Sequence, residues 1–403
     1  MATANPISES TAQSVRPAAG LLVLLAGISP DQLERVLDNL TSSFPTEELI
    51  VASPDGLSNA VASGYHPSLQ FVAAPATSAS WTLTADDFVN AAQLAEKYHA
   101  RAILMLGPGA GTVRSSGLLS LADSILTTQT DLAVAFYDMP PHAGLVNSAI
   151  LYPLTRALFD SRIRFPLAVD LCLSPRMAER MAGTAYRFTQ NNLGESPLWP
   201  LNEAAVARFT VDQFDVGPRN QSQSAGPDLN VILPLVTGAL FSDIEAKAAF
   251  WQRFRSLPPA GDFPPSQIPQ PSADAAAEIA PMLQAFRLAH TNLEEVWSLV
   301  LPPYTLLGLK RLAAAESAAF RMPDSLWARI VYDFLLAYRL RTINRGHLLG
   351  ALIPLYLGWV ASHINITSSG LSAESHIESV ATAFETEKTY LVSRWRWPDR
   401  FNP

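Results

Sequence analysis

The first half of the chain alternates short apolar runs with amphipathic helical segments, and this alternation limits the possible folds more than any other feature. Residues 21–26 form a continuous apolar run of buried-strand length. Leu33, Val36, Leu37 and Leu40 then recur at helical spacing. Further strand-like runs, separated by helical patterns, occupy 49–52, 69–73, 101–106 and 132–136. Strands that alternate with helices predict an α/β fold with a mostly parallel sheet covered on both faces.

Two segments of the sequence have the pattern of a helix N-terminus. Ser29 precedes Pro30 and has Gln32 three residues behind it, which predicts a capped helix with proline in its first turn. Thr84 and Asp87 have the spacing of a capping box. Both starts directly precede apolar residues at helical spacing, so they support the predicted alternation.

Composition excludes several classes of protein. The 403 residues include 28 Lys and Arg against 36 Asp and Glu, a formal net charge of −8, which argues against nucleic acid as the main partner. The single Cys excludes an intrachain disulfide framework and a cysteine-based zinc site. Residues 1–18 are small and polar without an apolar core, so we expect a disordered tail and a cytoplasmic protein.

The second half of the chain changes character. Between residues 187 and 228 the alternation of strand-like and helical segments ends, and the sequence is polar and contains Gly and Pro. Such a segment predicts either an active-site loop or disorder. Residues 257–272 contain six prolines and predict a linker, and helical patterns follow it. We therefore expect an α/β domain over 19–256 and a helical domain over 273–403.

One segment, residues 348–364, is apolar for about the length of the shortest membrane-spanning helix. Gly350, Pro354 and Gly358 interrupt it. A buried helix of the C-terminal domain is the favoured interpretation and a membrane contact is the alternative, so no integral membrane span is predicted.

Residues 132–181 resemble the middle of GT-A-fold glycosyltransferases of the glucosyl-3-phosphoglycerate synthase and mannosylglycerate synthase type. Weaker similarity extends over most of residues 20–365 and includes SPDGLSNA at 53–60. The matching positions are Tyr137, Asn147, Tyr152, Pro153, Leu154, Arg156, Ala157, Leu158, Pro166, Asp170 and Ser174.

The resemblance implies a GT-A domain, Rossmann-like, that transfers a hexosyl group from a UDP- or GDP-sugar to a small hydroxylated acceptor. It implies Asp170 as the catalytic carboxylate, for which a strand-end cap is the alternative. It implies that Asp55 contacts the nucleotide base, although Asp-Gly is also an ordinary turn. Tyr137, Asn147 and Tyr152 would lie on the acceptor side, and a homodimer is plausible by analogy.

Three family features are missing from this sequence. The family carries an Asp-x-Asp after its fourth strand that binds Mg²⁺ or Mn²⁺, but no Asp or Glu lies between Lys97 and Ala122. A metal-binding His expected after the sheet is absent from residues 211–228. Leu145 stands where the phosphoglycerate enzymes have an acceptor-binding Arg. The sequence therefore predicts no metal cofactor.

The Gly-rich segment after the fourth strand offers a substitute for the metal. Gly107, Gly109 and Gly111 could expose backbone N–H groups to phosphates, with Arg114 supplying positive charge. The alternative is a plain turn in a decayed site. Two functions follow: a metal-independent glycosyltransferase, or an inactive pseudo-glycosyltransferase that acts as a scaffold or regulatory partner.

Overall fold

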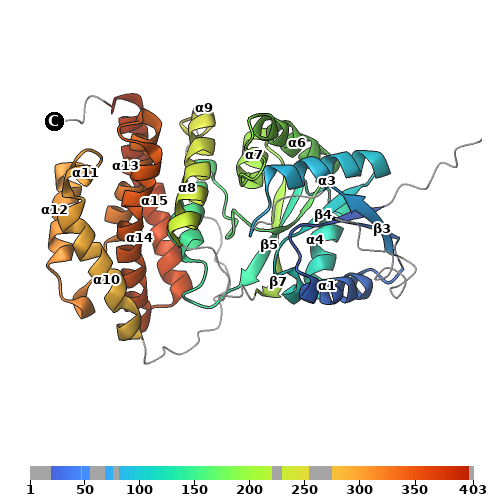
Figure 1. Cartoon of the computed structure of the whole chain (residues 1–403), viewed down its shortest axis with the longest axis horizontal. Helices are drawn as coiled ribbons and strands as arrows, with labels where there is room; N and C mark the ends of the chain where they lie inside the picture. The colour runs from blue at the N-terminus through green and yellow to red at the C-terminus, as the bar shows by residue number, and fades with distance from the viewer. Residues whose placement is uncertain are drawn as a thin grey trace, which may run out of the picture.

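The computed structural model describes residues 20–46, 48–54, 69–75, 81–219, 229–253 and 275–398. The predicted tail (1–18), Asp55 and the predicted linker (257–272) lie outside the described residues. Figure 1 shows two parts, a sheet with helices on both faces and a group of long helices beside it, with α8 between them.

A seven-stranded sheet forms the first part, in the order β3-β2-β1-β4-β6-β5-β7. Among the strands that the structure describes, β6 alone runs antiparallel to its neighbours, β4 and β5. The predicted mostly parallel α/β fold is therefore confirmed. The strands are β1 (Leu21–Leu25), β2 (Leu49–Pro54), β3 (Leu69–Ala74), β4 (Ala102–Leu106), β5 (Leu132–Asp138), β6 (Asp170–Leu173) and β7 (Val211–Pro218).

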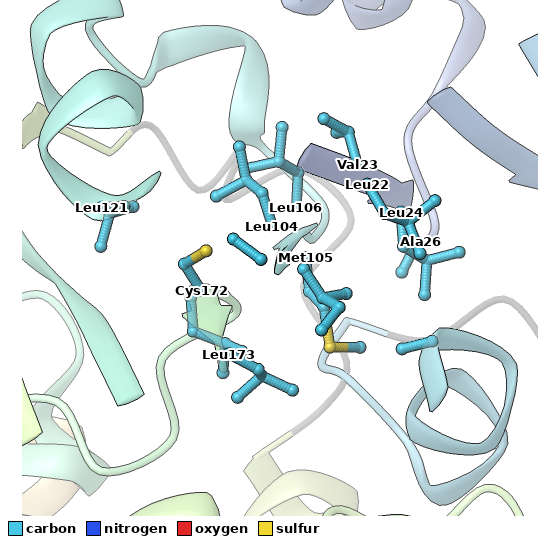
Figure 2. Close-up of a cluster of buried hydrophobic side chains, with 14 of the residues drawn as sticks. Leu22, Val23, Leu24, Ala26, Leu104, Met105, Leu106, Leu121, Cys172 and Leu173 are labelled. Carbon is cyan, nitrogen blue, oxygen red and sulfur yellow. The ribbon is translucent and has the colours of Figure 1, made fainter. Parts of the chain in front are cut away.

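The central strands are buried on both faces, which explains their continuous apolar sequence. Every residue of β1 and β4 is buried, and the two strands pair in parallel with Leu21 opposite Ala102. Figure 2 shows Leu22, Leu104 and Cys172 in the same apolar cluster. Full burial of a Leu side chain stabilises a fold by about 1.5–3 kcal/mol, so these strands dominate the first core.

Helices cover both faces of the sheet. α1 packs with α4, and α3 packs with α6 (Figure 1). The Thr84–Asp87 capping box is present at the start of α3, whereas Ser29 is the N-cap of α1 but makes no side-chain cap bond. The helices are α1 (Pro30–Ser43), α3 (Ala85–Tyr98), η1 (Ala110–Thr112), α4 (Ser115–Thr127), α6 (Pro175–Gln190) and α7 (Pro200–Ala207).

The prediction that residues 187–228 form an active-site loop or disorder was wrong for much of that segment. It contains the end of α6, all of α7 and the seventh strand, β7. β7 is an edge strand, and most of its residues are half-buried or exposed. An edge strand needs no continuous apolar run, so its sequence lacks the signal of the central strands.

The second part is helical, as predicted, and it has its own core. This core also contains residues of α5 and α8, which precede the Pro-rich segment. Trp251, Trp297, Trp327 and Trp359 are fully buried in it. Its elements are η2 (Asn147–Leu151), α5 (Tyr152–Phe159), α8 (Leu229–Ala246), α9 (Ala248–Trp251), α10 (Ala275–Asn292), α11 (Glu294–Ser298), α12 (Pro303–Ala313), η4 (Ser317–Ala319), α13 (Asp324–Leu340), α14 (Arg345–Ser368) and α15 (Ala373–Arg396).

Two helices in the described residues, α8 and α14, are long and apolar enough to cross a membrane by length and composition. In α14 67% of the apolar window is buried inside the protein, against 39% in α8. α14 packs on α10, α13 and α8. Its apolar surface thus belongs largely to the helical core.

A buried chain of polar side chains links three helices to the loop that follows β5. His376 on α15 lies 2.7 Å from His363 on α14 between their Nδ1 atoms, and its Nε2 lies 3.2 Å from Asp324 on α13. His363 Nε2 lies 3.4 Å from the Pro141 carbonyl, which can only accept. Burial, followed by the neighbouring His376, lowers the pKa of His363 to about 3, so its imidazole is neutral.

Candidate functional site at the carboxyl edge of the sheet

The predicted site residues cluster where the parallel strands end. Because β6 runs antiparallel, its first residue, Asp170, pairs with Leu106 at the end of β4. The loops after β4, β5 and β7 leave the sheet at this same edge. Ligands of open α/β sheets commonly bind there.

Asp170 has no exposed surface and is fully engaged by protein groups. Its Oδ1 accepts from the Gly107 backbone N–H at 3.1 Å, and its Oδ2 accepts from the Tyr137 hydroxyl at 2.9 Å. The Arg219 guanidinium forms an ion pair with the same Oδ2. In this arrangement Asp170 joins the ends of β4, β5, β6 and β7.

Arg219, which directly follows β7, is a site residue that the sequence analysis missed. It is 4% exposed, donates to the Pro108 carbonyl and lies over the Tyr137 ring with its Cζ 4.8 Å from the centroid. A Cβ atom at Gly109 would lie 3.4 Å from Arg219 Nε. That Nε has no hydrogen-bond partner among the described residues. The guanidinium thus reaches directly under the glycine-rich turn.

Burial sets the protonation of the side chains around Asp170. Desolvation raises the pKa of Tyr137, although the Arg219 charge opposes the rise, so the phenol stays a neutral donor. Desolvation also lowers the pKa of Arg219, and Tyr137 opposes that shift. The Tyr137 oxygen in turn accepts from the Asp170 backbone N–H at 3.1 Å. We call Asp170, Tyr137 and Arg219 the edge cluster.

The glycine-rich loop is a tight turn whose N–H groups mostly have partners inside the protein. Gly107 donates to Asp170, and Gly109, at φ +88°, donates to Gln32 Oε1 at 3.1 Å. A Cβ atom at Gly111 would lie 3.3 Å from Gln32 Cβ on α1. The loop therefore packs closely against α1, and this close packing by itself accounts for Gly109 and Gly111.

Arg114 lies on the outside of this edge. Its backbone N–H donates to the Val216 carbonyl at 3.0 Å, and its exposed guanidinium lies 3.8 Å from Asp215. Gly217, at φ +85°, leaves room for the Arg114 side chain, because a Cβ atom there would lie 2.6 Å from Arg114 Nε. Arg114 and Arg219 thus flank the end of β7, one exposed and one buried.

The two remaining predicted residues face other partners. Asn147 donates from Nδ2 to the Arg164 carbonyl at 2.9 Å. The Tyr152 hydroxyl donates to Glu378 on α15 at 2.7 Å, and Arg156 bonds both Glu378 and Glu385. The contacts of Tyr152 and Arg156 attach α5 to α15. The structure does not bring Asn147 or Tyr152 to the edge cluster.

No group of three or more His, Cys, Asp or Glu side chains capable of holding a metal ion occurs in the part of the chain that the structure describes. Residues 107–114, which follow β4, contain no Asp, Glu, His or Cys. The described residues at this edge therefore do not fit the divalent ion that the resemblance implies.

The sequence indicates that Asp170 needs a polar partner, but it does not identify that partner as Arg219. Asp170 stands in front of an apolar run, and a carboxylate buried in a sheet requires a charged or hydrogen-bonding partner. The partner comes from a polar segment 49 residues later (219 − 170) that carries no strand pattern. Sequence spacing alone cannot show that contact.

No protein-family model matches the chain, and no curated protein matches it. Among solved structures, glucosyl-3-phosphoglycerate synthase from Mycobacterium tuberculosis with phosphoglyceric acid is 17% identical with a TM-score of 0.37. That match covers 56% of this chain and 80% of the synthase. The same enzyme with Mn²⁺, UDP-glucose and phosphoglyceric acid gives 17% identity, the same coverages and a TM-score of 0.36.

A structure described only as a mycobacterial protein is 15% identical, with 56% of this chain and 74% of that chain covered and a TM-score of 0.37. The synthase belongs to the group that the sequence resembles.

Proposed function

We propose that the chain binds a nucleotide sugar at the carboxyl edge of its sheet and transfers a hexosyl group to a small hydroxylated acceptor without a metal ion. The observation that carries this proposal is the position of Arg219. It lies in the segment where the resemblance expects a metal-binding His, and its guanidinium lies against Gly109. Arg219 therefore comes from one of the two regions that supply metal ligands in the family and lies against the other, the turn after β4.

The chemistry requires a positive charge at this edge. A departing nucleoside diphosphate gains negative charge, and fixed cations stabilise it as a metal ion does. Arg219 supplies a buried charge balanced by Asp170, and Arg114 supplies an exposed one near the same strand end. Arg114 would meet the diphosphate directly, while Arg219 and Asp170 hold the glycine-rich turn in place.

The acceptor side has a different chemistry from that of the phosphoglycerate enzymes. Leu145 is buried in the helical core, at the position where those enzymes have an Arg. Without that charge, carboxylate or phosphate recognition loses its bidentate partner. We therefore propose an uncharged hydroxylated acceptor.

A second candidate is a pseudo-glycosyltransferase that acts as a scaffold. The observation that favours it is the full engagement of Asp170, which accepts from Gly107, Tyr137 and Arg219 and has no exposed surface. A carboxylate in that state contacts neither a substrate hydroxyl nor a metal ion. The scaffold candidate predicts a folded protein that neither binds nor turns over nucleotide sugars.

Turnover of nucleotide sugars in the presence of excess chelator separates the two candidates. Purified protein is incubated with UDP- and GDP-hexoses and a panel of polyols and hydroxy acids, and release of the nucleoside diphosphate is measured. Metal-independent release that Arg114→Gln reduces supports transfer. If no nucleoside diphosphate is released from any UDP- or GDP-hexose, and neither UDP nor GDP binds, the scaffold candidate is supported.

A further inference from the structure

A groove on α6 lies at the opposite edge of the sheet from Asp170. β6 begins at the carboxyl edge and ends at the amino edge, where Ser174 caps α6. The groove has a volume of about 550 Å³ and lies between α6 and Phe209, just before β7. Figure 1 shows α6 beside α7, over one face of the sheet.

The lining of this groove is positively charged although the chain is acidic. Arg176, Arg180 and Arg187 line it, and Glu179 is the acidic residue among the lining side chains. Three positive charges and one negative charge give the lining a formal charge of +2, against −8 for the chain. A concave surface with a net positive charge attracts anions. Two of the three arginines, Arg176 and Arg180, also have a carboxylate partner.

Arg180 is held in place by a carboxylate that already has another cation. Its Nε donates to Glu203 Oε2 at 2.7 Å, and Glu203 also pairs with Lys247 at 2.9 Å. Despite burial, which acts the other way, Lys247 and Arg180 lower the pKa of Glu203, so the carboxylate stays charged. Lys247 also forms an ion pair with Asp243, so the carboxylates of Glu203 and Asp243 together balance the charges of Arg180 and Lys247. Arg180 therefore offers a ligand its remaining N–H donors, because its Nε–H is used by Glu203.

Arg176 has two partners, an aromatic ring and the Asp131 carboxylate, with which it forms an ion pair. Its Cζ lies 4.6 Å from the centroid of Phe209, whereas Asp131 is 3.7 Å away. Asp131 also accepts from the Ser174 hydroxyl at 3.0 Å. Stacking on an aromatic face leaves the N–H groups at the edge of a guanidinium free to donate.

Unlike Arg176 and Arg180, Arg187 has no carboxylate partner among the described residues. Its Nη2 donates to Thr184 Oγ1 at 3.2 Å, and no carboxylate within the described part of the chain forms an ion pair with it. A guanidinium carries five N–H donors. Most donor capacity on Arg187 is therefore not used by protein carboxylates.

Gly183 leaves the floor of the groove empty. It lies inside α6, where Gly costs roughly 1 kcal/mol relative to Ala. A Cβ atom there would meet nothing within 4 Å, so packing does not require this glycine. The missing side chain instead adds space between the three arginines.

We propose that this groove binds the phosphoryl group of a small molecule. Planar guanidinium groups match phosphate oxygens with paired hydrogen bonds, and the three arginines of the groove come from a single rigid helix. The groove is separate from the edge cluster because β6 lies between them. It binds its ligand whether or not the carboxyl edge binds a nucleotide sugar.

Isothermal titration calorimetry of the full chain with inorganic phosphate and with glucose 6-phosphate tests this proposal. We expect saturable binding that weakens about tenfold or more, equivalent to about 1.4 kcal/mol, in Arg176→Gln/Arg187→Gln. Gly183→Leu should block the groove to a similar extent while leaving the melting temperature unchanged or higher. Arg311→Gln, an exposed arginine on α12, is the matched control and should bind as the unaltered chain does.

The two probes also identify the source of the phosphoryl group. Tighter binding of glucose 6-phosphate indicates an organic phosphate, and equal or tighter binding of inorganic phosphate indicates the free ion. The proposal is overturned if neither probe saturates, or if Gly183→Leu and the double arginine variant bind like the Arg311→Gln control.

Discussion

At the scale of single residues, Asp170 and Arg219 are the most consequential pair in the molecule. Both are buried, and each is the charged partner of the other. Removal of one partner from a buried pair leaves an uncompensated charge in a medium of low polarity. Replacement of both leaves neutral groups of similar size.

We therefore expect Asp170→Asn or Arg219→Gln alone to lower the free energy of unfolding by about 3–5 kcal/mol. The double variant should lose less than either single variant, because no charge is left unpaired. Urea unfolding followed by circular dichroism measures all three. Losses that simply add in the double variant would show that the two side chains do not interact.

His363 makes stability depend on pH. Burial lowers its pKa to about 3, below its usual value of 6.5, so the folded state binds fewer protons than the unfolded state between those values. The contribution of the neutral His363 side chain to the free energy of unfolding is complete above pH 6.5 and is lost as the pH falls toward 3. The slope has a maximum of about 1.4 kcal/mol per pH unit.

His363→Phe should remove that slope, whereas His347→Gln, at an exposed position on α14, should keep it. Unfolding free energies measured between pH 4 and 7.5 test the expectation. Equal pH profiles for His363→Phe and the unaltered chain would contradict the assignment of a buried neutral imidazole.

At the scale of elements, the sequence predicted the central strands and the edge strand β3, but it did not predict the edge strand β7. β1 and β4 were readable because burial on both faces demands continuous apolar residues, as in Leu21–Leu25. β7 was missed because an edge strand can be polar. The same loss of signal concealed Arg219, which follows β7. Gly107, Tyr137 and Asp170 were singled out, but their mutual contacts depend on a sheet order that local patterns do not reveal.

The contact between α4 and β7 depends on one glycine. A Cβ atom at Gly117 would lie 2.7 Å from Val216 Cα, which is backbone and cannot move aside easily. We expect Gly117→Ala to destabilise the fold by about 1–3 kcal/mol through overpacking. Gly183→Ala, also inside a helix but with free space, should stabilise it by about 0.5–1 kcal/mol.

Thermal and urea unfolding of the two glycine variants provide the comparison. Opposite signs support close packing of α4 on β7. Stabilisation by both substitutions would mean that α4 and β7 are farther apart than described.

At the scale of the whole molecule, the described residues form two large hydrophobic cores, and α7 contributes residues to both of them. Helix α5 lies between them: it follows the loop after β5, yet its apolar residues join the helical core. Arg156 connects it to Glu378 and Glu385 on α15. The helical part is therefore attached directly to the segment that leaves the carboxyl edge of the sheet.

The central claim is that this edge binds a nucleotide sugar without a metal ion, and thermal shift tests it most directly. UDP, GDP and their hexose derivatives are each added with excess chelator, with Mg²⁺ or with Mn²⁺. A ligand at 100 times its dissociation constant stabilises a fold by about 2.7 kcal/mol. We expect one nucleotide family to raise the melting temperature equally in all three conditions, and Arg114→Gln to abolish the rise. A rise only with metal, or no rise with any nucleotide, would contradict the claim.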